Sequence, residues 1–307
     1  MDIFLQQIIN GLVQGSIYAL VALGYTMVYG IMGLINFAHG EVVMIGTMVT
    51  ISVAGLLIKV GMPVALAGLA GLIAAVAVCM ALGWGLERIA YRPLRNAPRL
   101  APLITAIGMS IVLQNLAMMI WGRNYLTFPP LLPKVQFEFA GANFTSVQVI
   151  IVLVSALTMG GLLLLVYRTK LGMAMRATSQ NMAVASLMGV NINRVIAAAF
   201  VIGSALGALA GVMVGTYYEN AHYQMGFMLG LKAFTAAVLG GIGNLAGAML
   251  GGVLLGIIEA LGAGYIGDLT GGFLGSQYQD IFAFVVLIIV LMFKPSGLFG
   301  EKTGDRA

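Results

Sequence analysis

Charge is the scarcest property of this sequence. Charged side chains make up only 8% of the 307 residues, whereas hydrophobic residues make up 61% and the mean hydropathy is +1.03. Soluble domains carry roughly a quarter charged residues, so this chain has too little charge to cover a surface in water. The composition therefore excludes a soluble globular domain. It predicts a chain that lies in lipid, where each crossing helix needs about 20 apolar residues.

Cysteine, histidine and the usual catalytic motifs are also nearly absent. Cys79 is the only cysteine, which excludes an internal disulfide and a cysteine-based metal site, and His39 and His222 are the only histidines. The chain has no GxxxxGK[ST] phosphate loop, no HExxH and no GxSxG. We therefore expect no enzyme, no cofactor or metal held by this chain, and no nucleic-acid partner.

Long apolar runs are what the sequence does contain. None shows the alternation of about 10 residues that is typical of a membrane β-barrel. The fold class is therefore all-α, a polytopic membrane protein of about eight to nine segments with discontinuous or re-entrant helices, in a single transmembrane domain over residues 1–307. The candidate spans are 8–29, 42–58, 64–86, 101–121, 147–167, 195–217, 224–240, 245–264 and 280–293.

Basic residues gather in three segments, which indicates the cytoplasmic side. Those segments hold Arg88, Arg92, Arg95 and Arg99, then Arg168, Lys170, Arg176 and Arg194, and finally Lys294, Lys302 and Arg306. We expect the loop 122–146 outside and the C-terminus in the cytoplasm. The N-terminus is outside if 42–58 crosses the membrane, and inside if 30–58 dips in and returns. Trp84, Tyr91 and Tyr167 are typical of an inner boundary, although single aromatic residues also occur in cores.

The stretch GLINFAHGE, residues 33–41, is unusually polar for its surroundings. Asn36, His39 and Glu41 would be costly against lipid, and the glycines around them permit a break in a helix. A discontinuous helix that lines a translocation path explains both features. The alternative is a turn in the cytoplasm with Glu41 in water.

A weaker copy of this stretch occurs late in the chain. GLINFAHG, residues 33–40, can be aligned with GIGNLAGA, residues 241–248, so that Asn36 falls on Asn244. Interrupted segments in both halves are typical of transporters built from a repeat, although chance also explains a few identities. We predict Asn36, His39, Glu41 and Asn244 as residues of the path.

Two further patterns concern helix packing. FVIGSALGALAGVMVG repeats glycine every four residues, on one helix face that another helix can approach closely. We expect this face, Gly203, Gly207, Gly211 and Gly215, to pack within the chain rather than at a dimer seam. Lys232 and Glu259 lie in apolar segments and are candidates to pair with each other or to line a polar path. Alternatively, both reach water at helix ends.

The loop 168–194 is too apolar for a purely solvated loop. Its middle, MAVASLMGV, favours a short helix that Gly189 would end, with Leu187 and Met188 offered to a partner. An interfacial helix that touches only lipid is the alternative. The run ERIAYRPLRNAPRL places arginines at spacings of four, three and four, which suits binding of anionic headgroups.

Five of these segments together resemble one family. They are GSIYALVALGYTMVYGIMGLINFAHGE (15–41), ERIAYRPLR (87–95), AIGMSIVLQN (106–115), VASLMGVN (184–191) and GLKAFTAAVLGGIGNLAGAMLGG (230–252). The chain closely resembles the inner-membrane permeases of bacterial branched-chain amino-acid ABC importers, of the LivH type. The resemblance runs from about residue 3 to PSGLFG at 295–300.

The resemblance implies the rest of the machinery. Such permeases pair with a second homologous membrane subunit. Two cytoplasmic ATPase subunits hold ATP-Mg, and a periplasmic protein delivers leucine, isoleucine or valine. It also implies that the loop contacts an ATPase through Arg176, Ala185, Leu187, Met188 and Gly189. The family pattern has Glu-Ala-Ala with a glycine four residues later; here Ala185 and Gly189 fit, but Ala183 stands at the glutamate position.

Two other functions stay open at this point. One is a stand-alone secondary transporter or channel, which would need no ATPase on the loop 168–194. The other is a permease for urea or short amides, since related permeases carry these. We expect the substrate to be set largely by the binding protein.

Overall fold

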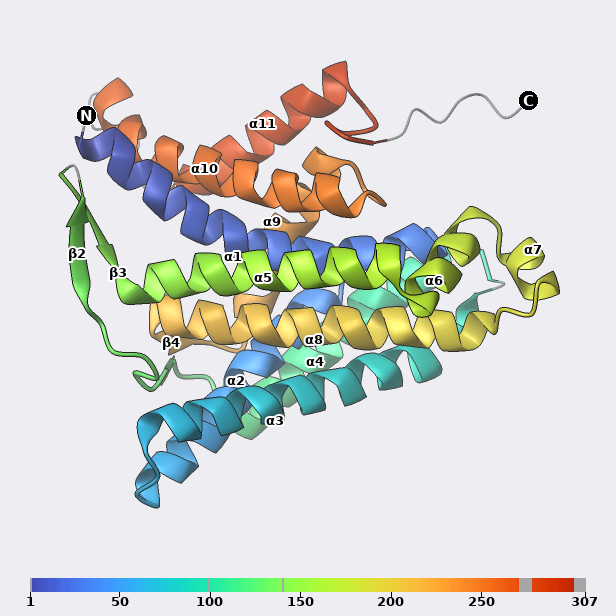
Figure 1. Cartoon of the computed structure of the whole chain (residues 1–307), viewed down its shortest axis with the longest axis horizontal. Helices are drawn as coiled ribbons and strands as arrows, with labels where there is room; N and C mark the ends of the chain where they lie inside the picture. Colours follow the sequence, from blue (N-terminus) through green and yellow to red (C-terminus); the bar gives the residue numbers. More distant parts are fainter. Residues whose placement is uncertain (1, 96, 99, 140, 271–277, 301–307) are drawn as a thin grey trace.

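Figure 1 shows the computed structural model of the chain, an elongated bundle of helices. The structure describes every residue except 1, 96, 99, 140, 271–277 and 301–307, so the predicted basic residues Arg99, Lys302 and Arg306 lie outside the described residues. The α-helices of the described part are α1 (Asp2–Met32), α2 (His39–Lys59), α3 (Val64–Gly85), α4 (Leu100–Trp121), α5 (Ser146–Arg168), α6 (Lys170–Gln180), α7 (Met182–Leu187), α8 (Ile192–Tyr218), α9 (Met225–Gly240), α10 (Leu245–Leu269) and α11 (Gln279–Phe293).

Each of the nine predicted apolar spans lies on one of these helices, and the all-α polytopic class is confirmed. Within the described residues, seven helices are long and apolar enough to cross a membrane: α1 to α5, α8 and α10. The apolar helices α9 and α11 are shorter, with 16 and 15 residues. Since a helix rises about 1.5 Å per residue, α9 and α11 fall short of a full hydrocarbon core of about 30 Å.

Helix α1 is the centre of the bundle and is buried along most of its length. It packs against α10 at glycines, because an ideal Cβ at Gly256 would lie 2.2 Å from the Gly15 backbone nitrogen. Such close approach is typical of helices in membranes, where small residues let backbones meet. The outer faces of α3, α4 and α5 carry exposed apolar residues, among them Leu66, Leu69, Ile73, Ile104, Ile107, Ile111, Leu153, Leu157 and Leu164.

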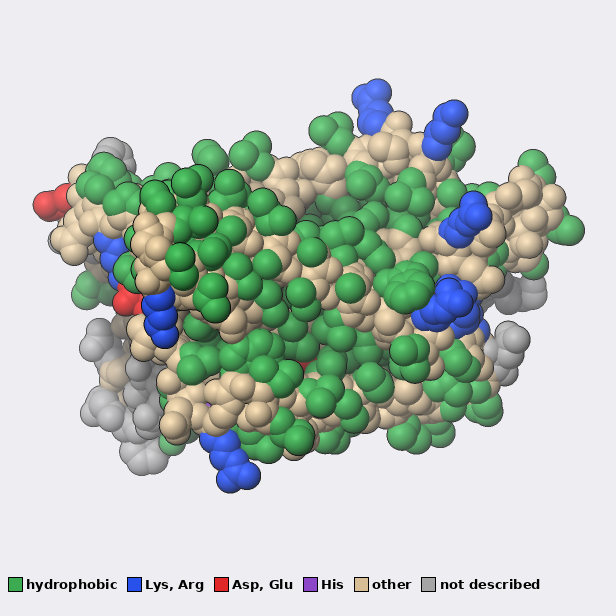
Figure 2. Space-filling model, turned by 90° about the horizontal axis from the view of Figure 1, so that it is seen from below, with side chains coloured by type: hydrophobic (Ala, Val, Ile, Leu, Met, Phe, Trp, Pro, Cys, Tyr) green, Lys and Arg blue, Asp and Glu red, His purple; other side chains and the backbone are tan. Residues whose placement is uncertain are grey.

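The two ends of the bundle differ in charge and structure. Short strands lie at one end, which we call the hairpin end (Figure 1): β1 (Leu126–Thr127) pairs antiparallel with β4 (Asn220–Ala221), and β2 (Gln136–Phe139) pairs with β3 (Ala142–Thr145). Helices α6 and α7 lie at the other end, which we call the basic end. Figure 2 shows an apolar belt between the two ends, with most of the visible basic side chains over the basic end.

The described helices also decide between the two paths considered for the N-terminal part. Helix α1 starts at the hairpin end, and the connection between α2 and α3 returns to that end (Figure 1). Helix α2 is 21 residues long and apolar, enough for a full crossing. Residues 30–58 therefore do not dip in and return. The start of the described chain lies at the same end as the loop 122–146.

Candidate functional site

The first helix break separates α1 from α2. Helix α1 ends at Met32, Gly33 takes a positive φ of 65°, and α2 begins only at His39. Asn36 holds the turn, because its Oδ1 atom accepts a hydrogen bond of 3.1 Å from the Ala38 backbone nitrogen. The same oxygen accepts a bond of 2.8 Å from the hydroxyl of Tyr91, which is buried. Tyr91 is thus a core residue rather than a boundary residue.

The polar side chains after this break are buried. His39 is 2% exposed and Glu41 is fully buried in the first turn of α2. Glu41 Oε1 accepts hydrogen bonds from Ser110 Oγ at 3.0 Å and Gln114 Nε2 at 2.8 Å, both on α4. The alternative of a turn with Glu41 in water is therefore wrong. A carboxylate at this position also complements the positive end of the α2 dipole.

Three polar atoms near this break make no hydrogen bond among the described residues. They are Thr26 Oγ1, His39 Nε2 and Glu41 Oε2, and all three are buried. An unpaired buried polar group costs about 1–3 kcal/mol, so few native proteins keep several together without a function. These atoms could form hydrogen bonds with polar groups of a small ligand, and Glu41 Oε2 could accept an ammonium group.

The second break separates α9 from α10. Helix α9 ends at Gly240, and Gly241 and Gly243 take positive φ values of 104° and 97°. Asn244 caps α10, accepting a hydrogen bond of 3.0 Å from Gly247 N and donating one of 2.9 Å to the Phe299 carbonyl. Asn244 is only half-buried, and its amide is committed to the cap and to the segment after α11.

The structure brings the two breaks together. An ideal Cβ at Gly30 would lie 3.6 Å from the carbonyl oxygen of Gly243. Between the breaks lies a cavity of about 10 Å³. Aromatic rings fill the neighbouring space: the Tyr25 ring centroid is 5.0 Å from that of His39 and 6.3 Å from that of Phe234. In this state the region between the breaks is closed to any amino acid.

A second polar cluster lies among α1, α9, α10 and α11. Lys232 Nζ lies 3.3 Å from Glu259 Oε2. This confirms the alternative in which these two residues pair with each other. Sequence reasoning missed two members: Asp280, 2.7 Å from Lys232, and Tyr18, whose hydroxyl donates to Glu259 at 2.8 Å. Nothing in the spacing of these residues shows that four helices meet here. A pocket of about 350 Å³ beside Lys232 opens toward β4.

At the basic end, α7 presents an apolar surface. The side chains of Leu187 and Met188 are 87% and 80% exposed, whereas Ala185 is buried. Helix α7 ends as expected near Gly189, which takes a φ of 86°. The Arg176 guanidinium lies 5.3 Å from the centre of the Tyr167 ring, a cation–π contact.

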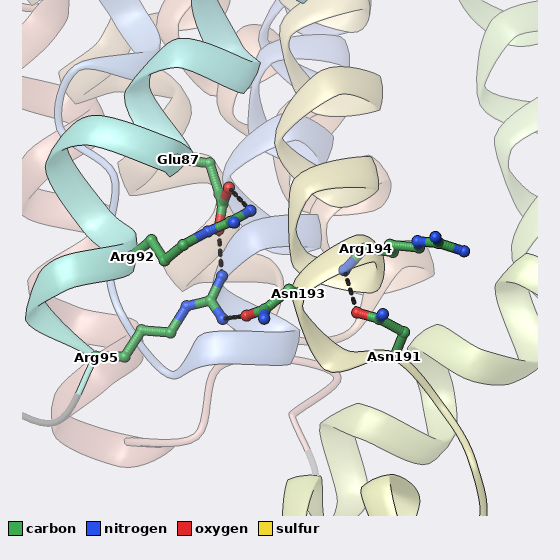
Figure 3. Close-up of polar contacts among 6 residues, drawn as sticks. All are labelled: Glu87, Arg92, Arg95, Asn191, Asn193 and Arg194. Atoms are coloured by element: carbon green, nitrogen blue, oxygen red, sulfur yellow. Dashed lines mark hydrogen bonds and ion pairs between the residues drawn. The ribbon is translucent and has the colours of Figure 1, made fainter.

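A buried ion cluster joins this end of α8 to the segment after α3, and sequence reasoning missed it. The π-helix η1 (Leu86–Tyr91) and the 3-10 helix η2 (Arg92–Leu94) extend α3. Glu87 of η1 is fully buried and accepts from Arg92 Nη2 at 2.8 Å and from Arg95 (Figure 3). Arg95 also donates to Asn193 of α8. Two of the arginines predicted to bind headgroups, Arg92 and Arg95, therefore form ion pairs with Glu87.

The glycine face of α8 packs against other parts of the same chain. An ideal Cβ at Gly203 would lie 3.3 Å from the Gly24 carbonyl, and one at Gly211 would lie 2.3 Å from the Val43 carbonyl. Gly207 faces His39, and Gly215 faces Phe128. This face thus lets α8 support the first break. Among the described residues, no three His, Cys, Asp or Glu side chains come together to hold a metal ion.

An apolar belt, two adjoining helix breaks and unpaired buried polar atoms define an integral membrane protein of the transport class. Comparison with known proteins gives the family. Residues 7–291 match the family described as "Branched-chain amino acid transport system / permease component", and the chain belongs to this family.

Several proteins are similar to the chain over nearly their whole length. One is the high-affinity branched-chain amino acid transport system permease protein BraD of Pseudomonas aeruginosa, 48% identical over 99% of this chain and 98% of its own. Another is the permease protein LivH of Escherichia coli, 46% identical over 99% and 97%. A probable LivH of Methanocaldococcus jannaschii is 27% identical over 97% and 94%.

A solved structure, PsaBC from Streptococcus pneumoniae in complex with Fab, is similar at a TM-score of 0.47 and 16% identity, over 95% of this chain and 92% of that chain. That likeness is too low to bear on fold or function.

Proposed function

We propose that this chain is the permease subunit of an ATP-driven importer that moves leucine, isoleucine or valine into the cytoplasm. The observation that carries the proposal is the sequence identity of 46–48% to branched-chain amino acid permeases over nearly the full chain. The chain itself has no phosphate loop, so ATP-Mg would be hydrolysed on two partner subunits. A second homologous permease and a periplasmic binding protein complete the proposed complex in the inner membrane.

The charge distribution supports an orientation. Arg88, Arg168, Arg176 and Arg194 belong to the segments at the basic end, and positive side chains favour the cytoplasmic side. We therefore assign the basic end and the C-terminus to the cytoplasm, and the hairpin end to the periplasm. The exposed Leu187 and Met188 would then face the ATPase subunits from the coupling loop, residues 168–194.

The path would run past the two helix breaks, along Asn36, His39, Glu41 and Asn244. A zwitterionic amino acid needs a partner for each charge and an apolar surface for its side chain. Backbone amides at the starts of α2 and α10 suit the carboxylate. The unpaired Glu41 Oε2 suits the ammonium group. Because the breaks are closed in this structure, the path would open when the helices move apart.

The test is to purify the chain from native membranes, identify the proteins that accompany it, and reconstitute the assembly in proteoliposomes with radiolabelled leucine. We expect ATPase subunits to co-purify, and uptake to require ATP and the binding protein. Excess isoleucine or valine should compete, and excess urea should not. Uptake by the chain alone on an ion gradient would contradict the proposal.

A further inference from the structure

We propose that the Glu87 cluster, formed by Glu87, Arg92, Arg95 and Asn193, connects the coupling loop to the first helix break. Movement of the α7–α8 connection would thereby reach Asn36 and open the path. The inference rests on the proposed function, because it takes α7 to be the ATPase contact. The residues named are positioning residues, which act through one another rather than on the substrate.

The first link joins the coupling loop to Arg95. Asn191 caps α8, accepting a hydrogen bond of 3.1 Å from Arg194 N, and Asn193 follows in the first helical turn (Figure 3). Asn193 Oδ1 accepts a hydrogen bond from Arg95. Only two residues, Gly189 and Val190, separate Met188, exposed at the end of α7, from the Asn191 cap. A force on α7 therefore acts directly on the start of α8.

The second link joins Arg95 to Glu87. The Arg95 side chain is only 18% exposed, and its Nε atom is buried without a hydrogen bond to any described residue. Its guanidinium therefore depends on Glu87 and Asn193 for partners. Glu87 is fully buried and is held by Arg92 as well as by Arg95, so the loss of Arg95 would leave it with one charged partner instead of two. Because a buried carboxylate with too few partners is costly, we expect Glu87 to shift with Arg95 when Arg95 moves.

The third link joins Glu87 to the helix break. Glu87 and Tyr91 both belong to the π-helix η1, which continues α3. The Tyr91 hydroxyl donates a hydrogen bond of 2.8 Å to Asn36 Oδ1, the atom that holds the turn before α2. π-helical turns are rare and are frequently found at functional sites. A shift of η1 would pull on Asn36 and so alter the break.

The connection could instead be a passive brace, and the two roles differ in their consequences. A brace would affect folding, assembly, ATP hydrolysis and transport together. If the cluster instead transmits movement, breaking it would leave ATP hydrolysis in place and lower transport. Spatial continuity alone does not distinguish them, so the ratio of leucine transported to ATP hydrolysed is the informative quantity.

The experiment uses the complete importer in proteoliposomes, with the variants Tyr91→Phe, Asn193→Ala and the double variant. Tyr91→Phe removes one hydroxyl and keeps the buried ring, so the chain should still fold. We expect normal co-purification of ATPase subunits and near-normal ATP hydrolysis, but at least a fivefold fall in leucine transported per ATP. Because the links lie in series, breaking a second link should add no further loss. The double variant should therefore transport as much leucine per ATP as the single variant with the lower ratio.

Matched controls are Tyr265→Phe on α10 and Asn115→Ala on α4. The Asn115 side-chain amide donates to the Ile111 carbonyl of its own helix and bonds to no other residue that the structure describes. Both controls should keep the wild-type ratio. An unchanged ratio in both single variants would overturn the proposal, as would losses that multiply in the double variant. Failure of the proposed function itself would look different: the wild-type chain would then bring down no ATPase or move no leucine with ATP.

Discussion

Burial decides what single residues can do in this protein. In water, Glu41 would be one solvated charge among many, but here it is fully buried and bound on one oxygen by two donors from α4. The other oxygen remains unpaired. At Asn36, one oxygen atom serves both the turn before α2 and the hydroxyl of Tyr91. Small changes at these two residues should therefore have specific effects on transport.

Replacing Asn36 with leucine should lower transport without preventing assembly. Leucine has a similar size but cannot accept the bonds from Ala38 N and Tyr91. Each hydrogen bond contributes about 0.5–1.5 kcal/mol, so we expect leucine uptake to fall on the order of tenfold. Uptake assays and gel filtration of the assembled importer measure the two properties. Unchanged uptake would place Asn36 outside the path.

Two substitutions at Glu41 separate its charge from its hydrogen bonds. Glu41→Gln keeps an acceptor for Ser110 and Gln114 but removes the charge, so the protein should fold while leucine uptake falls at least tenfold. Glu41→Leu should also lower stability by about 1–3 kcal/mol, because two buried donors lose their acceptor. Uptake and thermal unfolding in detergent measure these effects. Glu138→Gln, on an exposed strand, is the control, and equal uptake in both Gln variants would contradict a role for the Glu41 charge.

At the scale of elements, glycine sets how closely the helices approach. Helices α1 and α10 meet where Gly15 and Gly256 leave their backbones in contact, and the glycine face of α8 lies against α1 and α2. Hydrophobic burial gives little preference for helix contacts over lipid contacts, so close van der Waals packing carries much of the association. The breaks between helices depend on these contacts for their position.

Replacing Gly256 with valine should disrupt the α1–α10 contact. A Cβ there would lie 2.2 Å from Gly15 N, and backbone cannot move aside as a flexible side chain can. Overpacking costs about 1–3 kcal/mol or more. We expect a lower melting temperature and a lower yield of monodisperse protein. Gly160→Val, at a position with nothing within 4 Å, is the control and should behave as wild type.

The exposed apolar end of α7 predicts a contact with the ATPase subunits that a single introduced charge should disrupt. Leu187 is 87% exposed and touches little of its own chain, so Leu187→Asp should leave folding and insertion intact. It should abolish co-purification of the ATPase subunits, because burying an unpaired carboxylate in an apolar contact is costly. Ser179→Asp, at an exposed position on α6, is a matched control. ATPase subunits that still accompany Leu187→Asp would refute this contact.

At the scale of the whole molecule, charge and the apolar belt predict how the protein sits in a membrane. The basic end carries η1, η2 and the coupling loop, and the hairpin end carries the four short strands. The face between them that Figure 2 shows carries many hydrophobic side chains and few charged ones. This polarity makes a direct prediction about which end faces the periplasm.

Single reporter cysteines test the orientation, since the native Cys79 is buried. Val135→Cys at the hairpin end should react with a membrane-impermeant maleimide in intact spheroplasts. Ser179→Cys on α6, at the basic end, should react only after the membrane is permeabilised. Both positions are exposed in the structure and lie outside the proposed ATPase contact, so access to each depends on its side of the membrane. The reverse pattern of labelling would invert the proposed direction of transport.

Much of this architecture follows from the sequence alone. Apolar runs of sufficient length predicted the nine long or short apolar helices that the described residues contain, because lipid forces backbone groups to bond within a helix. Gly33 and the polar residues after it indicated the first break, and Gly189 indicated the end of α7. These features depend on local composition, so the residues close to each of them in the sequence are enough to predict them.

Only the tertiary structure decided which distant residues meet. The bond from Tyr91 to Asn36 joins the break between α1 and α2 to η1, and Asp280 reaches Lys232 from another helix. Glu87 finds Arg95 and, through it, Asn193 of α8 only after the helices have packed. Helix formation in lipid is determined by each segment separately, whereas the pairing of buried polar groups depends on how glycine-lined helices approach one another.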